Sequence, residues 1–408
     1  MRYAAPWATA TPRIRRESIG VSLKAHFSRF LNAAPERLHF AAHSHHLWPD
    51  VTFAAQEACW NDAARLADRK WDKIFGEVYP AAQGHVARLL GLSDPASVAF
   101  APNTHSFLLR LLSSFPPGQT IRVLTSDSEF HSFARQMRRL EEDGLVHVTR
   151  LPSEPFASFA ARFAEAAADG GHDLIYVSQV FYNSGYALAD LPALVAAVPD
   201  ADSLVVIDGY HGFLARPTDL SAIQERAFYM AGGYKYAVAG EGVVFLHAPP
   251  GYAPRPRDTG WYAAFSALET GGSEVGYATD AGRFLGATFD PVGLYRFNAV
   301  MDWLNEHALG VPDIHAHAHG LQQRFVTGLD ALGLTTLKSE QLVVPLEEPA
   351  RGNFLTFRTA SAGELYRKLL DTHVITDWRG DRLRFGFGLY QDESDVDRLC
   401  ERLGAALT

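Results

Sequence analysis

The sequence predicts an α/β protein built on a mostly parallel β-sheet that is covered by helices on both faces. Segments of continuous apolar residues, such as 173–178 and 203–208, alternate along the chain with amphipathic helical segments. Continuous apolar runs are typical of strands that are buried on both faces. Polar loops follow several of these runs, and ligands of such sheets bind beyond the carboxyl ends of the strands. A ligand site at these loops is therefore expected.

Residues 51–295 are expected to form the large α/β domain. The pattern of apolar residues at i, i+3 and i+4 predicts a long helical region first. Strands and helices then alternate up to a glycine-rich turn that joins the last two strands. The helical region covers 51–90; strands are expected within 97–115, 121–130, 146–152, 173–185, 203–213, 226–236 and 242–249, and further helices within 97–115, 135–144, 157–171 and 188–200.

After about residue 295 the pattern changes to that of a smaller α+β domain, residues 296–408. The segment 19–50 is expected to complete this domain, and residues 1–18 to be a flexible tail. Helices are expected at 294–308, 317–333, 361–371 and 393–407, and short strands at 342–346, 353–359 and 383–389.

Composition and charge exclude several functional classes. The chain has 408 residues, 47% of them hydrophobic and 20% charged, with a net charge of −9 and no basic block. Nucleic acid is therefore not an expected partner. No apolar run approaches the roughly 18 residues of a membrane span. Two cysteines, Cys59 and Cys400, are too few for a disulfide framework and favour a reducing cytoplasm.

One lysine stands out in the stretch AGGYKYAVAGEGVVFLHAP, residues 231–249. Lys235 is flanked by tyrosines and by glycines on both sides, which an exposed hairpin lysine does not require. A lysine amine can form a Schiff base with an aldehyde. The cofactor pyridoxal 5'-phosphate needs such a lysine, a carboxylate for its pyridine nitrogen, an aromatic plane for its ring and donors for its phosphate.

The sequence contains candidates for each of these partners. Asp208 ends an apolar strand, where a carboxylate is costly to bury without a cation. Phe130 follows the strand that begins at 121. Asn103 and Thr104 precede a helix, whose N-terminal amides favour a phosphate. The Asn103–Thr104 pair is also a good helix N-cap, and the two roles are compatible.

These residues, in this chain order, resemble those of class-V aminotransferases, pyridoxal-phosphate enzymes of fold type I, and among them kynureninases. The resemblance covers roughly residues 38–405 and rests on GYKY (233–236), DGYH (208–211) and DWRGDRLRFGFGLYQDESDVDRL (377–399). It implies a sheet of the seven-stranded type in the large domain and a homodimer with shared active sites.

The resemblance also assigns roles. It implies that Lys235 forms the Schiff base and that Asp208 binds the pyridine nitrogen, with His211 next to the site. Tyr234 would contact the phosphate and Phe130 would stack on the ring. Trp261, and Thr288 with Asp290, match stretches that reach the neighbouring subunit's cofactor, and Arg384 matches the arginine that binds the substrate α-carboxylate.

The sequence departs from kynureninases mainly on the substrate side. Phe133 replaces an acidic phosphate contact, Asp290 stands where they carry an asparagine, and HFAAHSHHLWP (39–49) replaces a glycine-containing element. In this segment His43 and Ser44 are the candidates for substrate binding. Its histidines could bind a carboxylate or move protons, or they could pack as structural residues. Arg384 could alternatively pair with Asp381 as a structural strand residue.

No metal site is expected. In HAHAHG (315–320) only His315 and His319 have the i, i+4 spacing of helical zinc ligands, and an exposed helix end is the favoured interpretation. We therefore expect an enzyme that acts on the Cα of an L-amino acid through Lys235. Kynureninase-like hydrolysis of a Cβ–Cγ bond is the first alternative, and a non-catalytic protein that binds pyridoxal phosphate is the second.

Overall fold

The computed structural model of the chain describes residues 22–267 and 274–407. The predicted tail, residues 1–18, lies outside the described residues. Within them, no helix combines the length and the apolar character that a membrane crossing requires.

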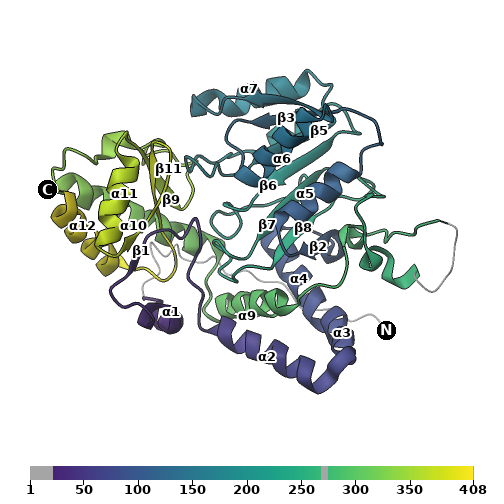
Figure 1. Cartoon of the computed structure of the whole chain (residues 1–408), viewed down its shortest axis with the longest axis horizontal. Coiled ribbons are helices and arrows are strands. Elements are labelled where there is room, and N and C mark those ends of the chain that lie inside the picture. Colours follow the sequence, from purple (N-terminus) through teal and green to yellow (C-terminus); the bar gives the residue numbers. More distant parts are fainter. Residues whose placement is uncertain (1–21, 268–273, 408) are drawn as a thin grey trace, which may run out of the picture.

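A seven-stranded sheet forms the centre of the larger part of the molecule (Figure 1). Its strand order is β2-β8-β7-β6-β5-β3-β4, and only β8 runs antiparallel to its neighbours. The predicted α/β class with a mostly parallel sheet is thus confirmed. The strands are β2 Val98–Ala101, β3 Ile121–Ser126, β4 Val146–Leu151, β5 Leu174–Ser178, β6 Leu204–Asp208, β7 Ala227–Gly232 and β8 Val244–His247.

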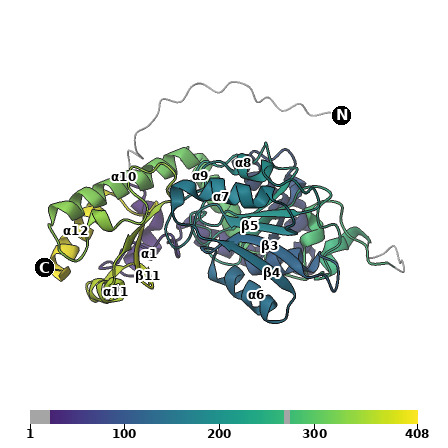
Figure 2. The same ribbon diagram turned by 90° about the horizontal axis from the view of Figure 1, so that it is seen from above.

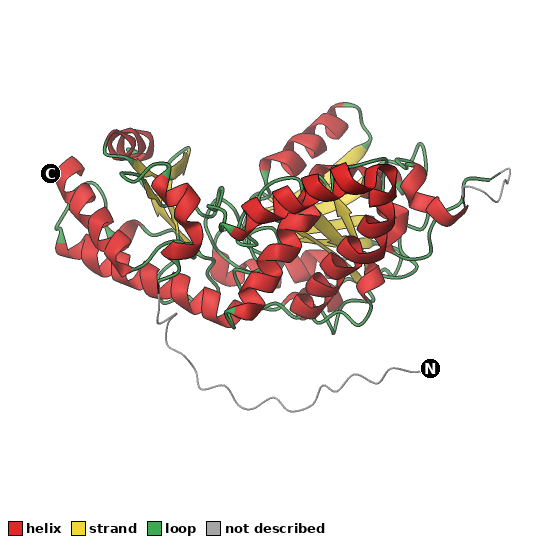
Figure 3. Ribbon diagram, turned by 90° about the horizontal axis from the view of Figure 1, so that it is seen from below, coloured by secondary structure: helices red, strands yellow, loops and turns green. Residues whose placement is uncertain are grey.

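Helices cover both faces of this sheet, as Figures 2 and 3 show. Right-handed crossovers place α5 and α6 on one face and α7 and α8 on the other. In agreement, α5 contacts α6 and α7 contacts α8. The bounds are α5 Thr104–Ser113, α6 His131–Glu142, α7 Phe156–Ala168 and α8 Leu191–Ala196.

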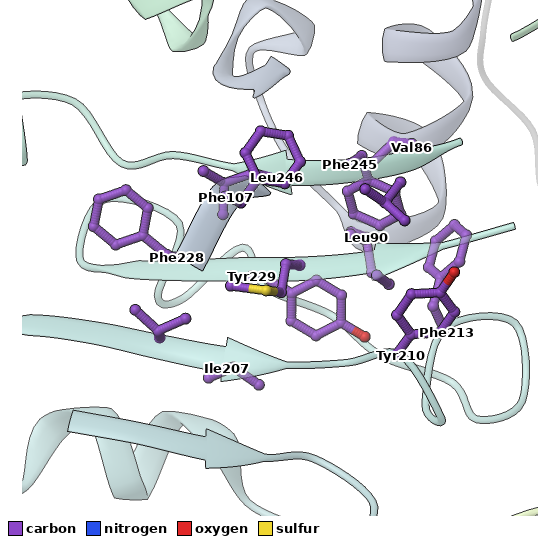
Figure 4. Packing of buried hydrophobic residues seen from close by; sticks show 14 of the residues in the cluster. Val86, Leu90, Phe107, Ile207, Tyr210, Phe213, Phe228, Tyr229, Phe245 and Leu246 are labelled. Atoms are coloured by element: carbon purple, nitrogen blue, oxygen red, sulfur yellow. The ribbon is translucent and has the colours of Figure 1, made fainter. Parts of the chain in front are cut away.

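The long helical region that the sequence predicts at 51–90 is a series of helices: α2 Val51–Leu66, α3 Lys70–Lys73, a π-helical turn Ile74–Val78 and α4 Tyr79–Leu90. It packs against α9 Val292–Glu306. Figure 4 shows Val86 and Leu90 of α4 beside Phe245 of β8, within the main hydrophobic core.

A second, smaller hydrophobic cluster lies in the C-terminal part of the chain. It packs α10 Val311–Ala331, α11 Ala362–Asp371 and α12 Glu393–Leu407 against a three-stranded antiparallel sheet. The strands of that sheet are β9 Phe354–Arg358, β11 Asp377–Arg379 and β12 Arg382–Gly386, and a two-stranded parallel ladder joins β1 Leu38–His39 to β10 Val374–Ile375.

The buried residues of α9 belong to the first cluster, whereas those of α10 from Ala318 onward belong to the second. We therefore propose that the small domain begins within α10 and not at residue 296. Leu38 and Phe40 also belong to the second cluster, which supports the proposal that the segment before residue 50 completes this domain.

The strand predicted at 342–346 is wrong: this segment makes one isolated bridge, between Leu342 and Phe357. Pro345 lacks the amide hydrogen that a ladder requires, which explains why pairing stops there. The short strands β1, β10 and β11 were not predicted, because two or three residues give no periodic signal.

The carboxyl ends of three neighbouring strands meet in register. Ser178, the last residue of β5, pairs with Asp208, the last residue of β6, and Asp208 pairs with Met230 of β7. The chain after β7 passes through Gly232 and Gly233 into the turn that carries Lys235. The fold thus places Lys235 next to the end of the strand that carries Asp208.

We expect Gly232→Ala to destabilise the protein. A Cβ at Gly232 would lie 2.3 Å from Val244 Cγ1 and 2.4 Å from the Tyr210 hydroxyl oxygen. Such overpacking costs about 1–3 kcal/mol, which would lower the midpoint of urea unfolding. Gly320→Ala is the matched control, because a Cβ there meets open space on α10 and a helical alanine should add about 0.5–1 kcal/mol. Equal midpoints for the two variants would contradict this account.

Candidate active site

Lys235 lies in the turn between β7 and β8 and is buried, with 5% of its surface exposed. Its Nζ donates a hydrogen bond to the backbone oxygen of His43, at 2.8 Å. Three aromatic rings surround the amine: the ring centroids of Phe130, Tyr210 and Tyr234 lie 5.7, 5.7 and 5.1 Å from Nζ. The lysine is thus held at one position inside the protein.

This environment lowers the pKa of Lys235 to about 7. Burial is the largest cause, because it disfavours the charged ammonium, and the positive charge of Arg384 adds to it. Asp208 acts in the opposite direction. A large fraction of the amine is consequently neutral near pH 7, and a neutral amine is the form that attacks a carbonyl carbon.

Asp208 is buried at the end of β6 and is bound by two neutral donors. The Tyr176 hydroxyl donates to Oδ2 at 2.8 Å, and the Tyr210 amide donates to Oδ1 at 3.0 Å. Burial raises the pKa of this carboxyl group. A cationic partner would remove that cost, and a protonated pyridine nitrogen is such a partner.

A second buried acid, Glu129, directly precedes Phe130 and was missed in the sequence. Its carboxylate accepts hydrogen bonds from the hydroxyls of Ser126 and Ser178, which end β3 and β5. Burial raises the pKa of Glu129 to about 7, and the negative charge of Asp208 contributes. Glu129 therefore fastens the loop of Phe130 to two strand ends.

A cavity of about 580 Å³ opens beside this cluster. The rings of Phe130, Tyr210 and Tyr234 form part of its wall, and Asn103 and Thr104 at the start of α5 form another part. Asn103 Oδ1 accepts a hydrogen bond from the Ser106 amide at 3.0 Å, so this residue is the N-cap of α5. Asn103 therefore caps α5 and also lines the cavity. The remaining lining residues are Pro102, His105, Ser132, Arg135, Glu241, Gly242 and Val244.

Arg384 on β12 is buried next to this centre and pairs with Asp377 on β11, the residue opposite it in the ladder. It also donates to the backbone oxygen of Tyr182, in the loop after β5. The alternative pairing of Arg384 with Asp381 is thus wrong. Asp377 opens the segment DWR, so its position next to Arg384 could have been inferred from a predicted hairpin.

His43 and His211 are buried beside Lys235. The His43 ring stacks on Phe354 with a centroid distance of 4.7 Å, and His211 lies 5.9 Å from the same ring. Burial and the charge of Arg384 lower the pKa of His43, and burial with the charge of Lys235 lowers that of His211. Both imidazoles are therefore neutral near pH 7.

The rest of the histidine segment serves mainly to hold the loop. His46 accepts from the Leu389 amide, and its own amide donates to the Tyr234 backbone oxygen at 2.9 Å. His45 is exposed and stacks on Tyr234 at 5.0 Å. Ser44 is half-buried in the turn that follows Ala41. His43 therefore lies within the site, whereas Ser44 only adjoins it.

Trp261, Thr288 and Asp290 do not join this cluster within one chain. Trp261 is 44% exposed and stacks on Tyr262 at 4.2 Å. Thr288 forms a hydrogen bond with Tyr262, whose ring lies 5.8 Å from that of Trp71 on α3. Asp290 lies just before α9 and accepts a hydrogen bond from the Val292 amide at 3.0 Å.

His315 and His319 were expected at an exposed helix end, and this expectation is wrong. They lie in the first half of α10, half-buried, with ring centroids 3.9 Å apart. His315 Nδ1 contacts the Ala215 backbone oxygen at 2.9 Å, and His319 contacts Arg351. Among the described residues, no group of three or more side chains is placed to hold a metal ion.

The cluster has the features that pyridoxal 5'-phosphate requires. Lys235 offers a buried amine, Asp208 a buried carboxylate that lacks a cation among its hydrogen-bond donors, and Phe130 a ring on the cavity wall. The start of α5 offers amide groups to a phosphate at the same cavity.

Glu129→Gln should remove one pH dependence of stability. A carboxyl group whose pKa is raised from 4.5 to about 7 in the folded state stabilises fully below pH 4.5, and this stabilisation is lost as the pH rises through 7. Between pH 5 and pH 8 the free energy of unfolding of the unmodified protein should fall by about 3 kcal/mol relative to the variant. Urea unfolding at several pH values measures the difference. The exposed Glu142→Gln is the control, and parallel pH profiles for Glu129→Gln and the unmodified protein would refute the assignment.

Comparison with known proteins agrees with this geometry. The chain is 29% identical over 377 residues to isopenicillin N epimerase of Streptomyces clavuligerus, covering 84% of this chain and 88% of that protein. It is 26% identical over 239 residues to kynureninase of Deinococcus radiodurans, covering 57% of each. Among solved structures, the apo cysteine desulfurase of Thermococcus onnurineus has a TM-score of 0.75 at 16% identity, over 91% of this chain and 95% of that one.

The last of these similarities shows the shared fold alone, which is the predicted fold type I. The profile of the family "Aminotransferase class-V" matches residues 60–399, the range that contains Lys235, Asp208 and Arg384. The predicted family and its cofactor are thereby confirmed. The chain belongs to the aminotransferase class-V family, whose cofactor is pyridoxal 5'-phosphate.

Proposed function

We propose that this enzyme acts on the Cα of an L-amino acid, with Lys235 first as the attachment point of the cofactor and then as the base that removes the Cα proton. The observation that carries the proposal is the state of Lys235. Its amine is buried and fixed by His43, and its pKa of about 7 suits proton transfer near neutral pH. A surface lysine would stay protonated and could serve neither purpose.

Four groups would hold the cofactor. Asp208 would pair with the pyridine nitrogen, and Phe130 would lie against the ring. Asn103, Thr104 and Tyr234, which share the cavity wall, would bind the phosphate. His211 lies next to Lys235 and would border the ring. When bound, pyridoxal phosphate supplies the electron sink that makes the Cα proton acidic.

Arg384 would bind the substrate α-carboxylate. A guanidinium can hold a carboxylate through two parallel hydrogen bonds, and Arg384 Nε has no hydrogen-bond partner although it is buried. Its hydrogen bond to the Tyr182 backbone and its pairing with Asp377 fix its direction. His43 and Ser44 would lie on the same side of the site.

A homodimer would explain Trp261, Thr288 and Asp290. Trp261 and Phe265 are 44% and 55% exposed and their ring centroids lie 5.5 Å apart, and adjoining exposed apolar rings can mark an interaction surface. We propose that this surface meets a second copy and places these residues at its cofactor. The cytoplasmic location remains a prediction from cysteine usage.

Several reactions begin with removal of the Cα proton. Transamination and kynureninase-like cleavage of Cβ–Cγ both do so. The similarity to an isopenicillin N epimerase and to a kynureninase supports this shared step more than it supports any one product. Cysteine desulfuration is disfavoured here. It needs a reactive thiolate, whereas burial raises the pKa of Cys59 and raises that of Cys400, on α12, to about 11.

Replacing Lys235 by alanine should abolish covalent attachment of the cofactor. After incubation with pyridoxal phosphate and reduction with borohydride, the unmodified protein should carry one pyridoxyl group per chain, detected by mass spectrometry. Lys235→Ala should carry none, and the exposed Lys338→Ala should label as the unmodified protein does. A label that persists in Lys235→Ala would disprove the assignment.

Arg384→Lys should weaken amino-acid binding while the cofactor stays attached. Lysine keeps the charge but not the two parallel donors, which should cost about 2–3 kcal/mol, or roughly 30–150-fold in kcat/KM. The assay is exchange of the Cα proton for deuterium in a panel of L-amino acids, which needs no knowledge of the product. Arg358→Lys on β9 is the control. Absence of exchange with every amino acid, despite a labelled Lys235, would favour the non-catalytic alternative.

A further inference from the structure

Three buried polar atoms on the substrate side of the site have no hydrogen-bond partner. They are Nδ1 and Nε2 of His43 and Nε of Arg384. His43 is 1% exposed and Arg384 is 3% exposed, so water does not reach them freely. An unpaired buried donor costs about 1–3 kcal/mol. Such atoms next to a reactive lysine indicate a ligand that completes their hydrogen bonds.

Asp377 lies between these two residues. Its Oδ2 pairs with Arg384 Nη2 and lies 3.8 Å from His43 Nε2, while its Oδ1 accepts from Arg379 Nη1 at 2.7 Å. The Oδ2 atom thus binds Arg384 and lies beyond hydrogen-bond distance of His43 Nε2.

We propose that His43 and Arg384 together bind the carboxylate of the amino-acid substrate, and that His43 takes up one proton from solvent as it binds. This inference rests on the proposed function and adds a specificity-determining residue to it. The substrate carboxylate would accept from the free Nε of Arg384 and from the protonated His43. The bonds that form are hydrogen bonds, and the single proton ends on the imidazole.

The charges around His43 explain why a proton is taken up only with a ligand. In the free protein, burial is the main reason that its pKa is low, and the nearby positive charges oppose protonation further. The single carboxylate of Asp377 is already shared by two arginines. An added substrate carboxylate supplies the negative charge that an imidazolium needs. The charged and titratable groups that face His43 are Arg384, Lys235, His211, His39 and Asp377.

The linkage gives a definite sign. Because the carboxylate raises the pKa of His43 from below its usual range, protons are taken up between the pKa of the free state and that of the bound state. Within this window, affinity for the carboxylate falls as the pH rises. An asparagine at position 43 can still donate a hydrogen bond but cannot take up the proton.

The test is calorimetric titration of the holoenzyme with propionate, a carboxylate without an amine, in Pipes and in imidazole at pH 7. The dependence of the heat on buffer ionisation gives the number of protons taken up. The unmodified protein should take up about 0.5–1 proton more than His43→Asn. Propionamide, which has no charge, should give no uptake. His45→Asn, two positions away and exposed, is the matched control and should behave as the unmodified protein does.

Equal proton uptake by His43→Asn and the unmodified protein would overturn the proposal, as would uptake with propionamide. The pyridoxyl label that His43→Asn retains after borohydride reduction shows that this variant is folded. If His43→Asn loses the label, the titration is repeated with His43→Gln. The outcome is separate from that of the proposed function. If proton uptake differs between the two proteins but Lys235 carries no pyridoxyl label, the attachment role of Lys235 is refuted and the carboxylate site is kept. If Lys235 carries the label but proton uptake is equal, the attachment role is kept and the carboxylate site is refuted.

Discussion

The structure of this site depends on the burial of one amine. Lys235 Nζ is held by the His43 backbone oxygen and enclosed by three aromatic rings, and burial lowers its pKa to about 7. Such burial would be costly for an ordinary lysine. The turn after β7 accepts it because Gly232 and Gly233 leave room for Val244, Tyr210 and the returning chain. Each further feature of the site compensates for, or exploits, this buried amine.

Both parts of the chain are needed to enclose it. The ends of β5, β6 and β7 supply Asp208 and the turn of Lys235, whereas β12 and the loop after β1 supply Arg384 and His43. Arg384 reaches back to the Tyr182 backbone, and Lys235 reaches out to His43. These two contacts couple the position of the smaller part to the centre of the site.

Much of this arrangement could be predicted from the sequence, because it follows from local patterns. Apolar runs revealed the sheet, and the loops at strand ends revealed Asp208, Phe130 and Lys235. One missed feature is a contact between segments distant in sequence, the hydrogen bond between Glu129 and Ser178. The strand expected at 342–346 fails for a local reason, because Pro345 lacks an amide hydrogen. A side chain's partner across the fold leaves no periodic trace in the sequence.

The ionisable side chains on the two sides of the site differ in their hydrogen bonding. On the cofactor side, Asp208 and Glu129 each accept two hydrogen bonds, so their positions are fixed before any ligand binds. On the substrate side, His43 and Arg384 keep unpaired nitrogens, and His43 lies in the segment 39–49 that departs from kynureninases. A fixed half suits a constant cofactor, and an unsatisfied half suits a ligand that must come and go. We therefore propose that the choice of substrate depends on the segment of His43 more than on Lys235.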